Sequence, residues 1–139
     1  MKIPYGIHSI DNDDIKEVIK DLKSNHITQG KTVKKFENKF KSYVGSNSCI
    51  AVNSGTSALN LALSLFNIKN KEVILPSLSF VSTAHCIIEN GGIPIFADVE
   101  PNTLCIDPKK IQQSISKNTI AILPVHFGGM SCNLKEIHK

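Results

Sequence analysis

Apolar positions in the first 45 residues recur with the spacing of an α-helix. The first set stands at i, i+3, i+4 and i+7, and it consists of Ile15, Val18, Ile19 and Leu22. This pattern predicts a helix with one buried stripe, and the acidic stretch at residues 11–14 provides N-cap candidates and negative charge for its first turn. Apolar residues between 33 and 44 predict a second amphipathic helix that stops at Gly45. The polar residues 27–30 would connect the two helices.

From residue 49 onward, short apolar runs alternate with helical stretches. The runs that predict strands are residues 49–52, 72–75, 93–97 and 119–123. The stretches that predict helices are residues 56–66, a segment with Val81, Ala84, Ile87 and Ile88 on one side, and a segment with Ile111 and Ile115 after Pro108. Continuous apolar strands joined by helices are typical of a parallel sheet that is covered on both faces, with right-handed crossovers.

The sequence therefore predicts an α/β fold, with a mostly parallel sheet between helices and two helices in front of it. We expect a helical segment at residues 1–48 and a partial α/β domain at residues 49–139. Near the end, Asn133 could cap a helix that begins at Leu134, but barely more than one turn would fit before Lys139. A helix this short contributes little by itself, so we interpret the sequence as the interrupted N-terminal part of a larger fold.

Composition and charge narrow the class of protein. With 41% hydrophobic and 20% charged residues in 139, the chain resembles soluble globular proteins. No apolar run approaches the roughly 18 residues that span a membrane, and the first residues lack the apolar core of a secretory signal, so we expect a cytoplasmic protein. The net charge is +4, but all 16 basic residues are lysines scattered along helical segments. Without arginine, a nucleic-acid surface is disfavoured.

The four cysteines give no sign of a metal site or a redox pair. Cys49, Cys86, Cys105 and Cys132 are far apart, and none belongs to a C-x-x-C motif. We expect structural thiols in a reducing compartment, with Cys49 as a small core residue.

The strongest candidate site is the corner at residues 53–59, between the first predicted strand and its helix. Gly55 would allow a ligand to approach the backbone closely, and free N–H groups with the helix dipole favour an anion there. The hydroxyls of Ser54, Thr56 and Ser57 could donate to phosphate oxygens. The alternative is an ordinary N-cap, since Ser and Thr are frequent at helix starts. The corner has neither a Walker motif nor a dinucleotide-binding G-x-G-x-x-G.

Two further candidates follow other predicted strands. Phe80 lies where a strand meets a helix, and its ring could stack on an aromatic ligand or pack in the core. His126 would reach the same sheet edge, since the carboxyl ends of parallel strands gather ligands, although a histidine in a glycine-rich turn is more often structural. We expect His85 to be a polar helix residue, and we expect Asp98 to cap or orient the following turn, without a catalytic role.

Several segments of the chain together resemble one known family. They are residues 27–30, 53–59, 76–84, 97–99, 106–108 and 124–129, and they occur in this order. The chain resembles the DegT/DnrJ/EryC1/StrS sugar aminotransferases, which are fold type I enzymes dependent on pyridoxal 5′-phosphate (PLP). The opening residues 3–6, with residues 27–30, are similar to members that aminate UDP-4-keto-6-deoxy-hexoses. The likeness covers nearly the whole chain.

The resemblance implies roles for matching residues only. It aligns Gly55, Thr56 and Ser57 with the turn that holds the PLP phosphate, and Phe80 with the aromatic residue stacked on the pyridine ring. His126 aligns with a family histidine and is expected to be among the cofactor-binding residues. The implied substrates are glutamate and a nucleotide-linked keto-deoxy-sugar, and the implied assembly is a homodimer without nucleic-acid or membrane partners.

The family's aspartate for the pyridine nitrogen and its cofactor-binding lysine fall downstream of residue 139. None of the 16 lysines occupies an equivalent motif, so we assign no catalytic residue and expect the 139 residues to be inactive alone. Three readings stay open: part of a sugar aminotransferase, part of a related PLP-dependent sugar dehydratase, or a non-catalytic remnant or half of a split enzyme.

Overall fold

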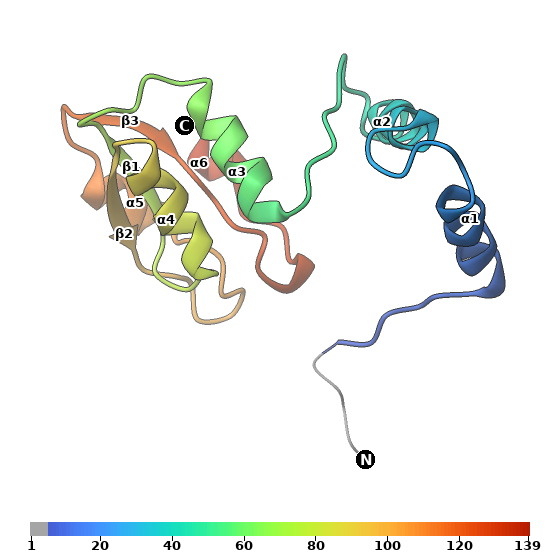
Figure 1. Cartoon of the computed structure of the whole chain (residues 1–139). Coiled ribbons are helices and arrows are strands. Elements are labelled where there is room, and N and C mark those ends of the chain that lie inside the picture. The colour runs from blue at the N-terminus through green and yellow to red at the C-terminus, as the bar shows by residue number, and fades with distance from the viewer. Residues whose placement is uncertain (1–5) are drawn as a thin grey trace. The chain divides into compact units, whose positions relative to one another are not determined.

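The computed structural model describes residues 6–139, so residues 3–5 of the opening motif lie outside it. The chain divides into two compact units, Met1–Ala51 and Val52–Lys139, each with its own elements (Figure 1). The assignment of residues 1–48 and 49–139 to separate domains stays a prediction.

The first unit contains the two predicted helices, α1 (Asn12–Leu22) and α2 (Lys31–Val44). Asp11 caps α1 by accepting hydrogen bonds from the backbone N–H groups of Asp13 and Asp14, and the Asp14 carboxylate accepts from the Asp11 N–H in return. α2 ends where Gly45 adopts a left-handed conformation with φ 70°. Both helices and the polar connection between them are confirmed.

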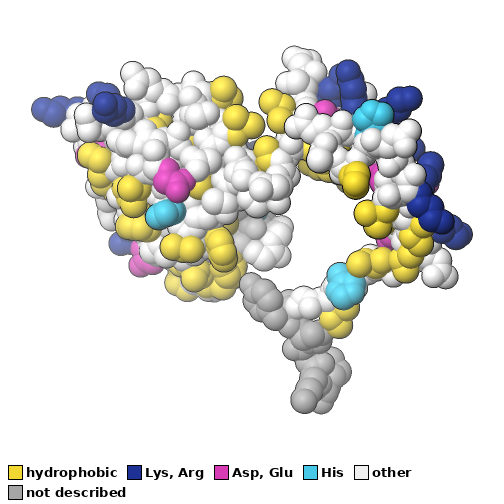
Figure 2. Space-filling model, viewed as in Figure 1, with side chains coloured by type: hydrophobic (Ala, Val, Ile, Leu, Met, Phe, Trp, Pro, Cys, Tyr) yellow, Lys and Arg dark blue, Asp and Glu magenta, His cyan; other side chains and the backbone are white. Residues whose placement is uncertain are grey.

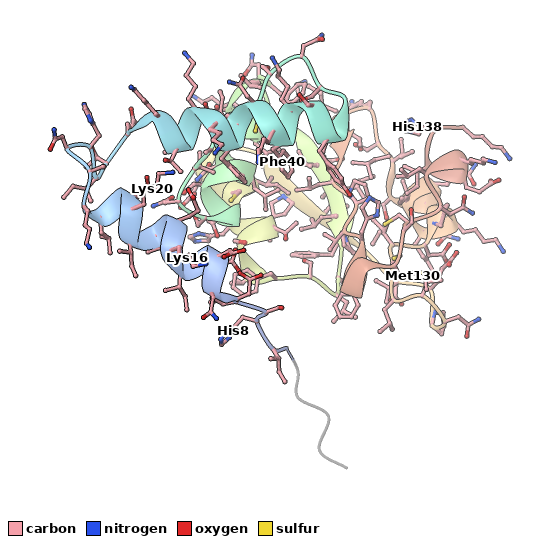
Figure 3. The ribbon with its side chains drawn as sticks, turned by 90° about the vertical axis from the view of Figure 1, so that its right-hand side faces the viewer. His8, Lys16, Lys20, Phe40, Met130 and His138 are labelled. Carbon is pink, nitrogen blue, oxygen red and sulfur yellow. The ribbon has the colours of Figure 1, made fainter. Side chains whose placement is uncertain are left out.

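The predicted buried stripe on α1 is not buried among the described residues. Its apolar side chains are 45 to 64% exposed, and neither α1 nor α2 contains a buried residue. Phe36 and Phe40 of α2 lie near each other, with ring centroids 5.9 Å apart, yet both are exposed. Figure 3 labels Phe40 together with Lys16 and Lys20 of α1. Helical periodicity thus identified the apolar face correctly, but the unit supplies no surface that covers it.

The second unit contains a three-stranded parallel sheet. Its strands are β1 (Glu72–Pro76), β2 (Ile93–Ala97) and β3 (Thr119–Ile122), and their order is β2-β1-β3. The register pairs Ile74 of the central strand with Ile95 on one side and Ile122 on the other. The parallel sheet predicted from the apolar runs is therefore confirmed for three of the four runs.

Helices cover both faces of this sheet, as predicted. They are α3 (Gly55–Ser64), α4 (Val81–Glu89), α5 (Pro108–Ser114) and α6 (Leu134–Ile137), with a short 3-10 helix at Phe127–Gly129. Val73 and Leu75 point to the face that α3 and α4 cover, whereas Ile74 points to the face with Ile111 of α5 and Ile137 of α6. This alternation follows from the two-residue period of a strand. Hydrophobic side chains also remain on the visible surface of both units (Figure 2).

The prediction of a strand at residues 49–52 is wrong. These residues form no strand, and Cys49 is half-buried rather than a core residue. A strand needs a neighbour for its backbone hydrogen bonds, and none of the strands among the described residues pairs with this segment. The Ala51 N–H instead donates to the Glu37 carboxylate at 2.9 Å.

Of the four apolar side chains expected on one side of α4, only Ile87 is buried. Val81 and Ile88 are 73% and 55% exposed, while Thr83, Cys86 and Ile87 are buried. These three stand at i, i+3 and i+4, so they form the stripe that packs against the sheet. Thr83 is polar, so this stripe does not appear in the sequence as a series of large apolar residues at helical spacing. The helix predicted after Pro108 is α5, in which Ile111 is buried, but Ile115 lies past the helix end and is exposed.

Candidate functional site

One edge of the sheet collects two of the predicted site residues. β1 and β3 are parallel neighbours, so their carboxyl ends lie at the same edge, and the Leu123 N–H extends their pairing by donating to the Ile74 carbonyl at 2.7 Å. Phe80 follows the end of β1, and His126 follows the end of β3. Ligands of open α/β sheets bind at this kind of edge.

The corner at the start of α3 has an ordinary N-cap. Ser54 is the cap, and its hydroxyl accepts a hydrogen bond from the Ser57 N–H at 3.1 Å. The Ser57 hydroxyl donates to the side-chain carbonyl of Asn53 at 2.7 Å and lies 3.0 Å from the Ser54 hydroxyl. The Ser57 hydroxyl proton is therefore already in use, and this residue would need to rearrange before it could donate to a ligand.

The capping leaves other donors of the corner open. Among residues 6–139, the backbone N–H groups of Gly55 and Thr56 and the Thr56 hydroxyl donate to no acceptor. A Cβ built on Gly55 would meet nothing within 4 Å, so the space beside the Gly55 backbone is open. Open N–H groups at the positive end of a helix dipole suit an anion. The corner therefore fits a phosphate through Gly55 and Thr56 better than through Ser57.

A buried thiol joins this corner to the next helix. The Cys86 side chain on α4 is fully buried and donates to the Thr56 carbonyl at 3.5 Å. Burial, and secondly the nearby Glu89 carboxylate, raises the pKa of the Cys86 thiol, which keeps it a neutral donor. Asn60 of α3 also contacts α4, because its side-chain amide donates to the Glu89 carboxylate and its carbonyl accepts from Asn90. These contacts fix the start of α3 relative to α4.

Phe80 is an exposed aromatic residue at the start of α4. It occupies the N-cap position, and 74% of its surface is accessible to solvent. The structure therefore excludes the alternative that Phe80 packs in the core. The ring is free to cover a flat ligand.

His126 is exposed and its ring is held in one orientation. Its Nδ1 accepts a hydrogen bond from the Cys132 backbone N–H at 3.0 Å, and the buried Cys132 thiol donates to the Val125 carbonyl at 3.1 Å. Gly128 and Gly129 have φ values of 59° and 85°, which lets the chain turn back between His126 and Cys132. Burial, and secondly hydrogen bonding with Cys105, raises the pKa of the Cys132 thiol.

The remaining candidates have structural roles. His85 is an exposed residue of α4 whose Nδ1 lies 3.5 Å from the Glu89 carboxylate. The Asp98 carboxylate accepts from the Val99 N–H at 2.8 Å, in line with the orienting role predicted for it, while Asp107 caps α5. Within residues 6–139, no three His, Cys, Asp or Glu side chains gather in a way that could hold a metal ion.

An apolar groove lies apart from these residues. It has a volume of about 230 Å³ and runs between α3 and β3, where Leu59, Leu63 and Phe66 face Ile120 and Leu123. None of the predicted site residues lines it.

Sequence reasoning missed the two thiols that contact the site. Cys86 and Cys132 were predicted only as structural thiols, and no local pattern shows that one would bond to Thr56 and the other would flank His126. The contact with Thr56 spans 30 residues of sequence, so it depends on how α3 and α4 pack.

The chain is similar to known proteins along most of its length. The sequence model of the DegT/DnrJ/EryC1/StrS aminotransferase family matches residues 8–139. The spore coat polysaccharide biosynthesis protein SpsC of Bacillus subtilis (strain 168) is 43% identical over 136 residues, which are 97% of this chain and 35% of SpsC.

Two solved structures share the fold closely. Helicobacter pylori PseC, an aminotransferase involved in the biosynthesis of pseudoaminic acid, matches with a TM-score of 0.89 and 31% identity over 99% of this chain and 38% of its own. GDP-4-keto-6-deoxymannose-3-dehydratase with a trapped PLP-glutamate geminal diamine matches with a TM-score of 0.90 and 30% identity over 99% of this chain and 37% of its own. The chain thus spans about a third of the length of the relatives it matches. No helix among the described residues is long and apolar enough to cross a membrane.

Proposed function

Because the chain belongs to the DegT/DnrJ/EryC1/StrS aminotransferase family, we propose that it forms part of a PLP-dependent aminotransferase that acts on nucleotide-linked sugars. The intact protein would move an amino group from glutamate onto a keto-deoxy-sugar. Support for the cofactor comes from the related dehydratase, which was solved with PLP and glutamate joined. Support for the sugar comes from relatives that take part in polysaccharide and pseudoaminic acid biosynthesis.

This proposal rests on two groups without a protein partner among the described residues: backbone N–H donors at the start of α3 and an exposed aromatic ring at the start of α4. The unpaired N–H groups of Gly55 and Thr56 would hold the PLP phosphate, and the exposed ring of Phe80 would cover its pyridine ring. Cys86 connects these features, because it bonds to Thr56 from the helix that Phe80 starts. Phe80 and Cys86 are six positions apart, which is about 9 Å along the helix axis.

The role of these residues is to bind and orient the cofactor. When bound, PLP supplies an electron-withdrawing ring that stabilises negative charge on a substrate carbon. Thr56 would fix one end of the cofactor through backbone and hydroxyl donors, and Phe80 would shield one ring face from water. We further propose that residues 1–139 do not catalyse amino transfer alone, since none of their lysines matches the family's cofactor-binding motif.

A second candidate is a PLP-dependent sugar dehydratase, which the similarity to GDP-4-keto-6-deoxymannose-3-dehydratase favours. The two activities would use the same corners to hold the cofactor. A non-catalytic role, as a remnant or as half of a split enzyme, differs from both. Amino transfer restored by a second polypeptide would identify a split enzyme.

The proposal can be tested with pyridoxine 5′-phosphate, which lacks the aldehyde and cannot react with the 16 lysines. Calorimetric titration should show binding that Thr56→Val weakens roughly 10-fold, because a hydrogen bond to a charged group is lost. Ser64→Ala, at the opposite end of α3, is the matched control and should bind normally. Equal binding of pyridoxine without the phosphate would contradict the phosphate site.

We also propose that the intact protein is a cytoplasmic homodimer. The exposed apolar faces of α1 and α2 support association, because large exposed apolar patches mark interfaces. Light scattering during size-exclusion chromatography would report the mass of the intact protein. A monomer at all protein concentrations would contradict the homodimer.

A further inference from the structure

The ring of His126 is held by the segment that follows it. The Cys132 backbone N–H donates to its Nδ1, and the Cys132 thiol donates to the carbonyl of Val125, the residue before the histidine. The main chain on one side of His126 and the ring itself are therefore both tied to Cys132. Cys132 is 4% exposed and packs in the core with Ile106 and Ile111, so the anchor is rigid.

This arrangement determines where the ring carries its proton. A nitrogen that accepts a hydrogen bond cannot hold a proton, so the neutral His126 ring must be protonated at Nε2. No hydrogen bond joins Nε2 to any of the residues 6–139, and the side chain is exposed. The result is an N–H donor with fixed orientation and no partner.

The donor lies at the sheet edge that also presents Phe80. His126 follows β3 and Phe80 follows β1, and these two parallel strands are adjacent. A residue with a purely structural role would need only its Nδ1. The chain positions the opposite nitrogen at the edge where we place the cofactor.

We propose that His126 is a fixed hydrogen-bond donor that recognises an oxygen atom of bound PLP through its Nε2–H, with Cys132 as the positioning residue. This inference rests on the proposed function, since it takes PLP as the ligand of this edge. It assigns the two ring nitrogens different tasks: Nδ1 orients the ring, and Nε2 binds.

The tautomer can be measured without any ligand. A long-range ¹H–¹⁵N correlation spectrum of the chain at pH 8 should show His126 protonated at Nε2 and bare at Nδ1. Addition of pyridoxine 5′-phosphate should then shift the Nε2 resonance, while that of His85 on α4 stays unchanged. A bare Nε2, or an Nε2 resonance that the bound ligand leaves in place, would overturn the inference.

Two substitutions separate the tasks of the nitrogens. His126→Asn keeps an acceptor near the position of Nδ1 and removes the outer donor, so its melting temperature should match wild type while affinity for pyridoxine 5′-phosphate falls roughly 5- to 30-fold. His126→Gln keeps a donor near the position of Nε2 and loses the inner acceptor, so its melting temperature should fall while its affinity exceeds that of the Asn variant.

The outcomes distinguish this inference from the proposed function. Wild-type protein that fails to bind pyridoxine 5′-phosphate contradicts both. Wild-type protein that binds, together with a His126→Asn variant of equal affinity, contradicts only the donor role of His126. If His126→Asn does not fold, the ligand-induced shift of the wild-type Nε2 resonance decides the matter.

Discussion

The thiol of Cys86 donates to the carbonyl oxygen of Thr56 at 3.5 Å, so a fully buried side chain of α4 contacts the first turn of α3. The two helices therefore cannot shift independently. Thr56 and Phe80, which belong to different corners of the fold, keep their relative positions through this contact and the Asn60–Glu89 hydrogen bond.

Replacing Cys86 should weaken both the fold and the site. Cys86→Ala removes a buried sulfur and its hydrogen bond, and we expect the free energy of unfolding to fall by about 1–2 kcal/mol. Urea denaturation followed by circular dichroism measures this change. Cys49→Ala is the matched control, because Cys49 is only half-buried and should change stability less. Equal effects of the two substitutions would show that Cys86 does not join the helices.

The buried thiols predict a loss of stability in alkaline solution. Burial raises the pKa of Cys86 and Cys132 above their ordinary value of 9.0. As pH rises past 9.0, the unfolded thiols release protons that the folded thiols retain, so the unfolded state is favoured. Below pH 9.0 these thiols are protonated in both the folded and the unfolded state, so they contribute no pH dependence to the free energy of unfolding. Urea denaturation between pH 8 and 10.5 should show this decline, and the decline should be smaller in Cys86→Ala. An unchanged decline in the variant would contradict the role of this thiol.

Gly55→Ala should separate stability from ligand binding. The added methyl meets no atom of the chain within 4 Å, and alanine favours helix more than glycine does, so the fold should become more stable by up to about 1 kcal/mol. The same methyl would narrow the open space beside the Gly55 backbone, where we expect the phosphate to approach, and should weaken binding of pyridoxine 5′-phosphate. Thermal melting and calorimetry measure the two effects.

Gly45→Ala is the comparison for that experiment. Gly45 has a φ of 70°, which strains any other residue, so this substitution should lower stability. If Gly55→Ala leaves the ligand affinity unchanged, the α3 corner does not hold the phosphate.

Phe80→Ala should change binding with little change in stability. An exposed side chain contributes little to folding, whereas loss of a stacking partner should lower affinity for pyridoxine 5′-phosphate about 3- to 10-fold. Phe80→Tyr should retain the affinity. Phe66→Ala is the matched control, since Phe66 is exposed at the apolar groove between α3 and β3. Equal losses from the two alanine variants would exclude stacking by Phe80.

The sequence was sufficient for the elements whose formation is local. The capping residue Asp11, the stop at Gly45 and the three paired apolar runs are all where periodicity and capping rules predict them. The strand expected at residues 49–52 failed because pairing depends on a neighbouring strand, which local pattern cannot supply.

Predictions for the site divide in the same way. The sequence located the helix start next to Gly55 and left Phe80 open between ligand stacking and core packing, and the structure shows an open space beside Gly55 and an exposed Phe80 ring. Two hydrogen bonds could not be predicted, because they depend on exact side-chain and loop geometry. They are the bond from the Ser57 hydroxyl to Asn53 and the bond from the Cys132 N–H to His126.

We infer that the start of α3 binds the phosphate of PLP while Phe80 covers the attached ring. Intermolecular nuclear Overhauser effects between the protein and bound pyridoxine 5′-phosphate test it most directly. We predict contacts from the ligand's single ring proton to the Phe80 ring and from its 5′-methylene, beside the phosphate, to the amide protons of Gly55 and Thr56. Contacts confined to other residues, with none to this corner or to Phe80, would contradict the account.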